Sequence, residues 1–196
     1  LNISNKRISD LTPLMGLPQL SRLDVSGNEI SDLRPLIGLP NLTELDASYN
    51  LIHETSSVGA MSQLTTLNLS GNPISDYAGL EKMTKKLWKL ELRNTGVTDT
   101  DLIHFSALKT LQLLDLQENP GLSNRAVEAL KSSITGCTIL CSDLVYEVDF
   151  CGHLVRSDEK ILLFPSSGIT ALTGLEKMSG LEELNLRDNS IDSLYL

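Results

Sequence analysis

A short phrase recurs along the chain at intervals of 22–25 residues, and this period constrains the fold more than any other feature. It is written LDVSGNEI at residues 23–30 and LDASYNLI at residues 45–52, with spaced apolar positions and an asparagine. The first apolar residue of each copy stands at Leu1, Leu23, Leu45, Leu67, Leu90, Leu114, Cys137, Leu162 and Leu184. A period of this size predicts an array of stacked coils along the whole chain.

Each copy begins with the pattern of a half-buried strand. In LTELDASYN, Leu45 and Ala47 alternate with Glu44, Asp46 and Ser48, which places the apolar side chains on one side. A single strand cannot bury that side alone, so successive coils have to stack about 4.8 Å apart. We therefore predict a parallel sheet over a continuous leucine core.

The segment ISDLRPLIGLP returns the chain along the opposite side of the coil. Its apolar residues Ile30, Leu33, Leu36 and Leu39 recur at every third position, and Pro35 excludes a long regular helix. This spacing predicts a tight 3₁₀ turn, in which side chains three residues apart eclipse one another. The carboxylates expected to accept from unpaired backbone N–H groups at these turns are Asp10, Asp32 and Asp76.

Two coils are longer than the others, VTDTDLIHFSALKTL and LSNRAVEALKSSI. The second has Ala126, Val127 and Leu130 at helical spacing, and Ser123 or Asn124 is placed to cap it. We expect short α-helices to replace the 3₁₀ turns in both coils.

The repeated asparagine is expected to be structural. At the bend after each strand, backbone groups lose their sheet partners but stay buried, and an asparagine side chain offers both donors and an acceptor. The predicted ladder consists of Asn28, Asn50, Asn72, Asn119 and Asn189. At the matching positions of the other coils, the ladder is interrupted by Lys6, Thr95, Ser142 and Ser167.

The phrase ISDLRPLIGLPNLTELDASYN resembles the bacterial-type 22-residue leucine-rich repeats of internalin-like surface proteins. AVEALKSSITGCTIL is similar to the segment that often closes such an array, and the stretch from VYEVDF to LEELNL is similar to a hairpin that opens another block. The resemblance covers nearly the whole chain. It implies an α/β solenoid with a parallel concave β-sheet, 3₁₀ and short α-helices on the convex side, and a protein partner on the concave face.

The expected organisation is a repeat array of about seven coils at 1–142, a β-hairpin-like junction at 143–160 and further repeats at 161–196, all in one continuous solenoid. In the junction, the alternation of Tyr146, Val148 and Phe150 predicts a strand that ends at the turn CGH. A hinge between two blocks is the alternative. Because the sequence opens and stops inside repeat phrases, we expect a fragment of a longer protein.

Strand positions that point away from the core are the candidate binding surface. Those predicted to contact a partner are Arg22, Asp24, Glu44, Asp46, Asn68, Trp88, Lys89, Glu91, Arg93 and Asp115. Trp88 stands where other coils have small polar residues, so it is either an interface anchor or a cover for the core edge. Tyr49, beside the ladder, is a second candidate anchor.

Three cysteines and His153 allow three alternatives near the junction. Cys137 is expected to point inward in place of leucine, which suits cysteine as a small buried residue. A Cys141–Cys151 disulfide is possible if the protein is exported. A zinc site is less favoured, because Cys137, Cys141, Cys151 and His153 lack the usual two-residue gaps.

Nothing in the sequence favours catalysis, a cofactor or a nucleic acid partner. None of the three histidines (His53, His104 and His153) lies in a known catalytic or phosphate-binding motif. The net charge of −9 opposes binding to phosphate backbones and to anionic membrane surfaces. There is also no run of 18 apolar residues that would span a bilayer.

The sequence therefore predicts a non-catalytic, monomeric protein-binding module of a larger bacterial protein, secreted or attached to the cell surface. The alternative is a cytoplasmic scaffold or regulatory subunit that uses the same face. A catalytic domain outside this sequence is a third possibility.

Overall fold

The computed structural model describes residues 1–141, 147–157, 159–178 and 180–192. The chain divides into two compact units. The first, here called the N-terminal array, comprises Leu1–Leu122 and Ala126–Asp143, and the second, the C-terminal unit, comprises Ser123–Arg125 and Leu144–Leu196. Ser142 and Tyr146 lie outside the described residues. A single solenoid through both units stays a prediction.

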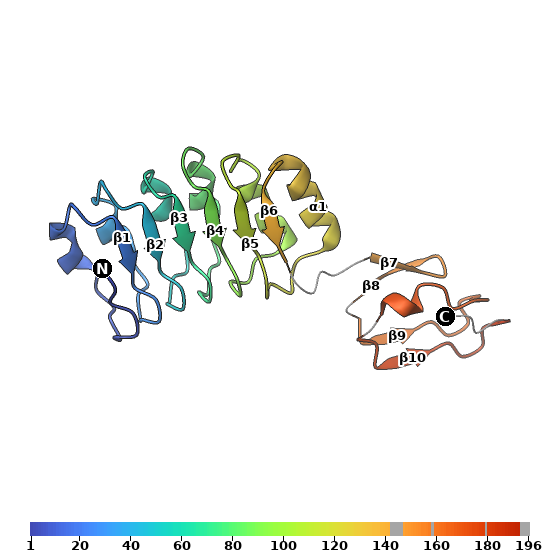
Figure 1. The fold of residues 1–196 in the computed structure, drawn as a ribbon. Coiled ribbons are helices and arrows are strands. Elements are labelled where there is room, and N and C mark those ends of the chain that lie inside the picture. The colour runs from blue at the N-terminus through green and yellow to red at the C-terminus, as the bar shows by residue number, and fades with distance from the viewer. Residues whose placement is uncertain (142–146, 158, 179, 193–196) are drawn as a thin grey trace. The chain divides into compact units, whose positions relative to one another are not determined.

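The described part of the N-terminal array contains a parallel sheet whose strands pair in chain order (Figure 1). Its strands are β1 (Arg22–Asp24), β2 (Glu44–Asp46), β3 (Thr66–Asn68), β4 (Lys89–Glu91), β5 (Leu113–Asp115) and β6 (Thr138–Leu140). A bridge between Asn2 and Asp24 adds the first coil to the edge of the sheet. Each of these repeats thus contributes one short strand to the parallel sheet.

The central residue of each strand is an inward-pointing apolar side chain. These residues are aligned in register at Leu23, Leu45, Leu67, Leu90, Leu114 and Ile139. Leu67 is 1% exposed, because its neighbours in the coils on both sides cover it. The continuous leucine core follows directly from the alternation along each strand.

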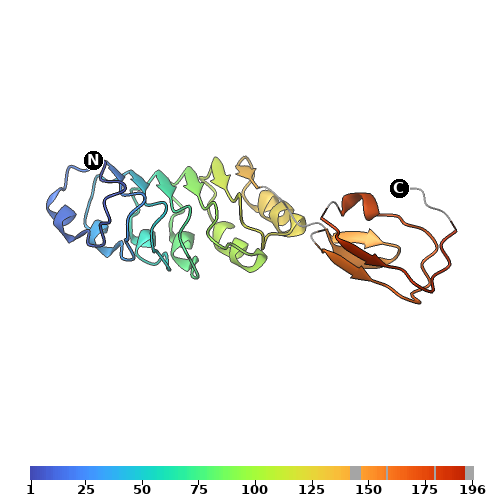
Figure 2. The ribbon, with the colours of Figure 1, turned by 90° about the horizontal axis from the view of Figure 1, so that it is seen from below.

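The return segments form 3₁₀ helices on the other side of the array from the strands (Figures 1 and 2). They are η1 (Thr12–Gly16), η2 (Arg34–Leu36), η3 (Val58–Ala60), η4 (Ala78–Lys82) and η5 (Asp99–Phe105). The parallel sheet on one side and the short helices on the other confirm the predicted leucine-rich repeat solenoid.

Carboxylates start three of these turns, as the sequence predicted. Asp10 Oδ1 accepts from the Thr12 N–H at 2.8 Å, and Asp32 Oδ1 accepts from the Arg34 N–H at 2.9 Å. A third carboxylate does the same at η4, where the Ala78 N–H lies 2.8 Å from Asp76 Oδ1. The guanidinium of Arg34 also donates to Asp32, which lowers the pKa of that carboxyl.

α-Helices were predicted in both long coils, but only the second of these coils contains one. Helix α1 (Asn124–Ser133) is an α-helix that begins one residue after Ser123. The earlier coil keeps a seven-residue 3₁₀ helix, η5, which begins with a reciprocal capping box between Thr98 and Asp101. Its buried residues Leu102 and Phe105 are three apart, a spacing that fits a 3₁₀ helix as well as an α-helix.

The prediction that Cys137 takes the inward leucine position of its strand was wrong, because that position belongs to a residue two places later in the chain. Ile139, not Cys137, pairs with Leu114 in the sheet, and Cys137 lies before β6 and is only partly buried. An α-helix rises about 1.5 Å per residue against about 2.0 Å for a 3₁₀ helix. The coil that contains α1 therefore needs more residues to span the same distance before its strand begins.

The asparagine side chains bond to the backbone of their own coil and of the preceding one. Asn50 Nδ2 donates to the carbonyl oxygens of Val25 and Ala47 at 3.0 and 3.1 Å, and its Oδ1 accepts from the Ile30 N–H at 3.0 Å. Hydrogen bonds of the same kind are made by Asn28, Asn72, Asn119 and Asn189. Buried backbone groups at the bends thus obtain partners.

Thr95 takes the ladder position without breaking the hydrogen bonding around it. Its Oγ1 donates to the Leu92 carbonyl at 2.8 Å, much as an asparagine amide does in other coils. Asn119 of the next coil accepts from three successive N–H groups, those of Thr95, Gly96 and Val97. Among the described residues, no buried side-chain nitrogen or oxygen lacks a hydrogen-bond partner.

The C-terminal unit begins with an antiparallel hairpin of β7 (Glu147–Phe150) and β8 (His153–Arg156). The two residues between the strands, Cys151 and Gly152, have φ of 53° and 86°. Positive φ at both central residues is typical of the type I′ turn that matches strand twist. Glycine accommodates that conformation without steric cost, whereas Cys151 adopts it as a non-glycine residue.

The rest of the C-terminal unit resembles coils of the array. Strands β9 (Ile161–Leu163) and β10 (Glu183–Asn185) pair in parallel, with η6 (Leu175–Lys177) between them in the chain. Leu162 and Leu184 face each other in register, as their repeat positions predict. The hairpin and these coils share a core whose buried residues are Val148, Phe150, Leu162, Ile169, Leu172 and Met178.

Candidate functional site

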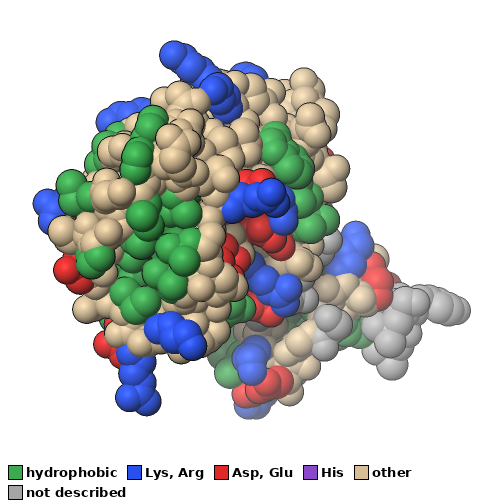
Figure 3. Space-filling model, turned by 60° about the vertical axis from the view of Figure 1, so that its left-hand side comes forward, with side chains coloured by type: hydrophobic (Ala, Val, Ile, Leu, Met, Phe, Trp, Pro, Cys, Tyr) green, Lys and Arg blue, Asp and Glu red, His purple; other side chains and the backbone are tan. Residues whose placement is uncertain are grey.

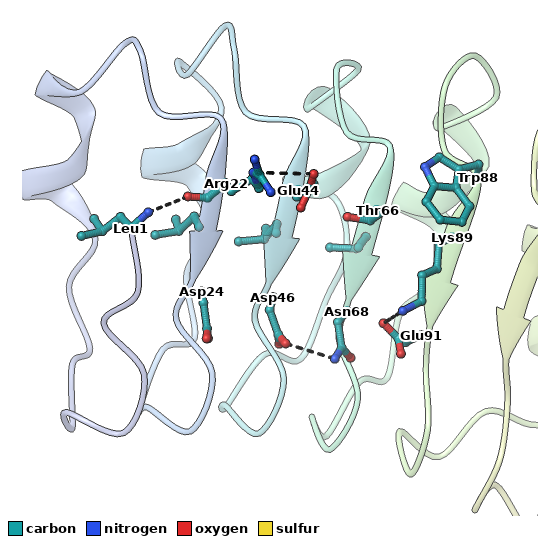
Figure 4. Close-up of a pocket in the computed structure, with 13 residues that line it drawn as sticks. Leu1, Arg22, Asp24, Glu44, Asp46, Thr66, Asn68, Trp88, Lys89 and Glu91 are labelled. Atoms are coloured by element: carbon teal, nitrogen blue, oxygen red, sulfur yellow. Dashed lines mark hydrogen bonds and ion pairs between the residues drawn. The ribbon is translucent and has the colours of Figure 1, made fainter.

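The face of the sheet turned away from the core carries a shallow hollow over β1–β4 (Figure 4). Its volume is about 420 Å³. It is lined by Leu1, Arg22, Leu23, Asp24, Glu44, Leu45, Asp46, Thr66, Leu67, Asn68, Trp88, Lys89 and Glu91. Because the strands are short and hydrogen-bonded on both sides, their outward side chains stand at fixed spacing on a rigid backbone.

Most of the residues predicted to contact a partner line this hollow. They are Arg22, Asp24, Glu44, Asp46, Asn68, Trp88, Lys89 and Glu91. Arg93 and Asp115 belong to the same face but are not among its lining residues. The Arg93 guanidinium donates to Glu118 at 2.6 Å, and this hydrogen bond lowers the pKa of the Glu118 carboxyl.

Trp88 occupies the position just before β4. The backbone N–H of Trp88 donates to the Thr65 carbonyl at 2.9 Å, and the backbone carbonyl of Trp88 accepts from the Gln112 N–H at 2.8 Å. These bonds place the backbone in the sheet, while the side chain lies at the edge of the hollow (Figure 4). The residue is 42% exposed, so a large aromatic surface is accessible to a partner.

Tyr49 is more exposed, at 61%, and has a φ of 53°. Its ring lies against Gly71 of the next coil, where a Cβ atom would come within 2.5 Å of Tyr49 Cδ1. Gly71 therefore leaves the space that the tyrosine ring fills. The aromatic side chain is held at the turn that follows β2, outside the lining of the hollow.

Two ion pairs lie within the hollow (Figure 4). Lys89 Nζ is 3.0 Å from Glu91 Oε2, and both side chains are about 30% exposed. Arg22 Nε is 3.9 Å from Glu44 Oε1, and these side chains are more exposed. Each pair places a basic group beside an acidic one, more closely for Lys89 and Glu91 than for Arg22 and Glu44.

Asp24 and Asp46 are the remaining acidic residues of the hollow, and they are neighbours in register on β1 and β2. Asp24 Oδ1 accepts from the N–H and the hydroxyl of Ser26, at 3.0 and 2.7 Å. Asp46 Oδ1 accepts from the corresponding groups of Ser48, at 3.0 and 2.6 Å. These bonds fix one oxygen of each carboxylate. The other oxygen of Asp24 faces Asn2 of the preceding coil, and the other oxygen of Asp46 faces Asn68 of the next strand.

These bonds belong to a second series of repeated side-chain hydrogen bonds, which was not predicted from the sequence. The motif Asp/Asn-x-Ser recurs at 22-residue spacing, as Asn2-Ser4, Asp24-Ser26, Asp46-Ser48 and Asn68-Ser70. In each copy the first side chain accepts from the N–H of the serine two residues later. The recurrence was visible in the sequence, since such local bonds are common for Asp and Asn at turns.

The described residues offer little for metal or thiol chemistry. No cluster of three or more metal-ligating side chains occurs within the described ranges. The three cysteines are free, and burial raises the pKa of the Cys137 and Cys141 thiols, which disfavours thiolate formation. Cys151 Sγ lies 2.7 Å from the Ala171 carbonyl oxygen of its own unit.

His104 and His53 make contacts away from the hollow. The imidazole Nδ1 of His104, on η5, contacts Glu81 of η4. His53 Nδ1 lies 3.1 Å from the Pro73 carbonyl oxygen. These two histidines therefore take part in local contacts between neighbouring coils, whereas His153, on β8, stacks on Phe164 with ring centroids 4.7 Å apart.

Apolar side chains gather over the first coils when the array is viewed from its N-terminal side (Figure 3). Exposed apolar residues of these coils include Leu1, Met15 and Leu17. Acidic and basic side chains lie next to one another beside this area (Figure 3). In the described part of the chain, no helix is long and apolar enough to cross a membrane.

Comparisons with known proteins agree with this architecture. Residues 40–82 match the family described as Leucine Rich repeats (2 copies). The fold is similar to that of an internalin (inlF) from Listeria monocytogenes, with 20% identity and a TM-score of 0.62 over 95% of this chain. It is also similar to an internalin C2 (inlC2) from the same species, with 20% identity and a TM-score of 0.61 over 99% of this chain.

The alignments cover different shares of those proteins. The chain spans 47% of the length of the first internalin and 73% of the second. No curated protein matches the chain. At this level of identity the likeness concerns the fold, and the residues of the hollow have to be argued from their own geometry.

Proposed function

We propose that this chain, a leucine-rich repeat protein with an internalin-like fold, is a non-catalytic module that binds another protein. The contact surface is the outward face of β1–β5, centred on the hollow. The observation that carries the proposal is a preformed, partly neutralised hollow with an accessible tryptophan at its edge. Exposed aromatic side chains on rigid surfaces are frequent energetic centres of protein interfaces.

The proposed interface contains Arg22, Asp24, Glu44, Asp46, Asn68, Trp88, Lys89, Glu91, Arg93 and Asp115. Their strands already hold the backbone in place, so a partner does not have to order it on binding. A broad face of this kind suits a folded protein better than a small molecule, because the hollow is shallow and open. We further propose that the module belongs to a secreted or surface-attached bacterial protein.

A second candidate function is that of a cytoplasmic scaffold or regulatory subunit. The observation that favours it is that Cys137, Cys141 and Cys151 are all free. Free thiols persist in reducing compartments, whereas exported proteins often oxidise them. Counting reactive thiols in protein isolated from its native source separates the two candidates: three support the cytoplasmic setting, and fewer support export.

Blocking the hollow tests the proposed interface. Thr66 lies in its centre (Figure 4), so Thr66→Trp fills the space with a large side chain. The matched control, Ser62→Trp, adds the same group at an exposed turn after η3. Proteins captured by the wild-type chain from its native source are quantified with both variants.

We expect Thr66→Trp to abolish capture of the specific partner and Ser62→Trp to retain it. Trp88→Ala should weaken the same interaction about thirtyfold, or about 2 kcal/mol, the lower bound for an interface hot spot. Capture that survives Thr66→Trp but is lost with Ser62→Trp would place the interface elsewhere and overturn the proposal.

A further inference from the structure

The charges within the hollow are unevenly compensated, and this unevenness points to the chemistry of the partner. The inference rests on the proposed binding function of this face. Lys89 is paired with Glu91, and Arg22 lies beside Glu44. In the described chain, Asp24 and Asp46 have neither a Lys nor an Arg side chain within ion-pair distance.

The two carboxylates stand on neighbouring strands, and each is held by a neutral donor on its far side. Asp24 Oδ2 accepts from the Asn2 amide at 2.7 Å, and Asp46 Oδ2 accepts from the Asn68 amide at 3.4 Å. Since β1 and β2 are adjacent strands, the two residues are separated by roughly 4.8 Å at the backbone. Like charges directly opposite on neighbouring strands oppose one another, so a cation that contacts both carboxylates from above the sheet would be favoured.

Trp88 supplies the other half of the recognition surface. It lies across the hollow from β1, two strands beyond Asp46, and is 42% exposed. The face of an indole ring attracts guanidinium and ammonium groups and also covers aliphatic side chains. An extended partner segment that crosses the strands can therefore contact the aspartates and the tryptophan together.

A metal ion is a weaker occupant than an organic cation. Calcium takes six to eight oxygen ligands, and magnesium requires near-ideal octahedral coordination. Here one oxygen of each carboxylate already accepts from a serine N–H and hydroxyl, and no third acidic, histidine or cysteine side chain joins the pair within the described residues.

We propose that the partner presents a basic segment whose Lys or Arg side chain bridges Asp24 and Asp46, with a neighbouring cationic or apolar side chain on Trp88. The chain's net charge of −9 favours the approach of such a segment at low ionic strength. A negatively charged partner is disfavoured by the same field.

An unbiased peptide selection tests this proposal. The full chain is immobilised and exposed to a phage-displayed library of random dodecapeptides. Binding of the best-enriched peptide is then measured in solution. Because Trp88 is the only tryptophan, its fluorescence reports binding at the hollow directly.

The main variant is Asp24→Asn with Asp46→Asn. It removes both charges but keeps an acceptor for the serine N–H groups, and Asn68 already fills this role on β3. The control is Glu29→Gln with Glu128→Gln, which removes two charges from exposed residues outside the hollow. Thermal unfolding of each variant shows whether the fold is retained.

We expect enriched peptides to be rich in Lys and Arg and their affinity to fall as salt is raised. The Asp24/Asp46 variant should bind the selected peptide about tenfold more weakly, as expected for two partly exposed charge contacts, and the control should bind normally. Millimolar Mg²⁺ or Ca²⁺ should compete no better than the same ionic strength of Na⁺.

Three results would overturn the proposal: no enrichment of basic peptides, unchanged affinity in the Asp24/Asp46 variant, or specific displacement by a divalent cation at constant ionic strength. The binding function is judged separately, by the effect of Thr66→Trp on protein capture. If Thr66→Trp removes capture while basic peptides fail to bind, the function stands and the partner chemistry is wrong.

Discussion

The N-terminal array and the C-terminal unit use the same coil but bury it to different degrees. In the array, Leu45, Leu67 and Leu90 are at most 2% exposed, and each has a paired strand on both sides. In the C-terminal unit, Leu184 is only partly buried, and β10 pairs only with β9 among the described residues. The inward leucine of a coil is fully buried when neighbouring coils cover it on both sides.

The outward faces also differ. The array presents Asp24 and Asp46, whereas β9 presents Ile161 and Leu163, which are 51% and 57% exposed. Both sets follow from the same alternation along a strand, so the alternation fixes which side chains point outward but not their chemistry. Surface function therefore varies along a solenoid while the core remains the same.

The largest expected effect comes from glycines at close backbone contacts. A Cβ on Gly79 would lie 1.8 Å from the Thr55 carbonyl oxygen, and one on Gly174 would lie 2.6 Å from the Asp149 carbonyl oxygen. We expect Gly79→Ala to lower the free energy of unfolding of the array by about 3 kcal/mol, and Gly174→Ala to lower that of the C-terminal unit by about 2 kcal/mol.

Urea unfolding followed by Trp88 fluorescence measures the first effect, because Trp88 belongs to the array. Hydrogen exchange in β9 and β10 measures the second. If Gly79→Ala leaves the Trp88 transition unchanged, the close contact between Gly79 and the Thr55 carbonyl does not exist in solution.

A smaller effect is expected in the array at high pH. Tyr77 is buried, packs edge-on against Phe105 and donates to the Thr95 carbonyl at 2.7 Å. Burial raises the pKa of Tyr77 to about 12 from 10.0. The unfolded chain therefore loses this proton first, and the contribution of Tyr77 is present below pH 10 and is lost as the pH rises to 12.

Between pH 8 and 11.5, the wild-type array should lose about 2 kcal/mol more unfolding free energy than Tyr77→Phe, which has no phenol to ionise. The measurement is a pair of urea titrations at each pH. Equal losses in the two proteins would show that the phenol is not shielded in the folded state.

The asparagine ladder provides a matched pair of substitutions across the two units. Asn50 is 4% exposed, whereas Asn189 is partly exposed, although both make the same kinds of hydrogen bond. Asn50→Leu should cost about 2 kcal/mol, because buried backbone groups lose their partners. Asn189→Leu should cost about 1 kcal/mol, because water replaces part of what is lost. Chemical denaturation of the array and hydrogen exchange of the C-terminal unit compare them.

The sequence was sufficient to predict the coil, the strand positions and the 3₁₀ turns, because each is set by apolar spacing that repeats nine times. It did not predict the displacement of β6, because the rise of the intervening helix decides where that strand begins. It also failed to separate a 3₁₀ helix from an α-helix at η5, since spacing of three residues suits both.

The surface was predictable as a set of outward positions but not as a site. Which carboxylates are neutralised depends on side-chain geometry, such as the 3.0 Å contact between Lys89 and Glu91. That Asp24 and Asp46 keep no such partner, and that Trp88 stays accessible, became apparent only from the structure.

Carboxyl footprinting tests the central claim most directly. The chain is labelled with a carbodiimide and an amine, alone and with its captured partner, and modification is measured at each acidic residue. The account predicts that the partner protects Asp24 and Asp46 and leaves Glu29 and Glu128 unchanged. Protection of Glu29 or Glu128, with Asp24 and Asp46 labelled as before, would contradict it.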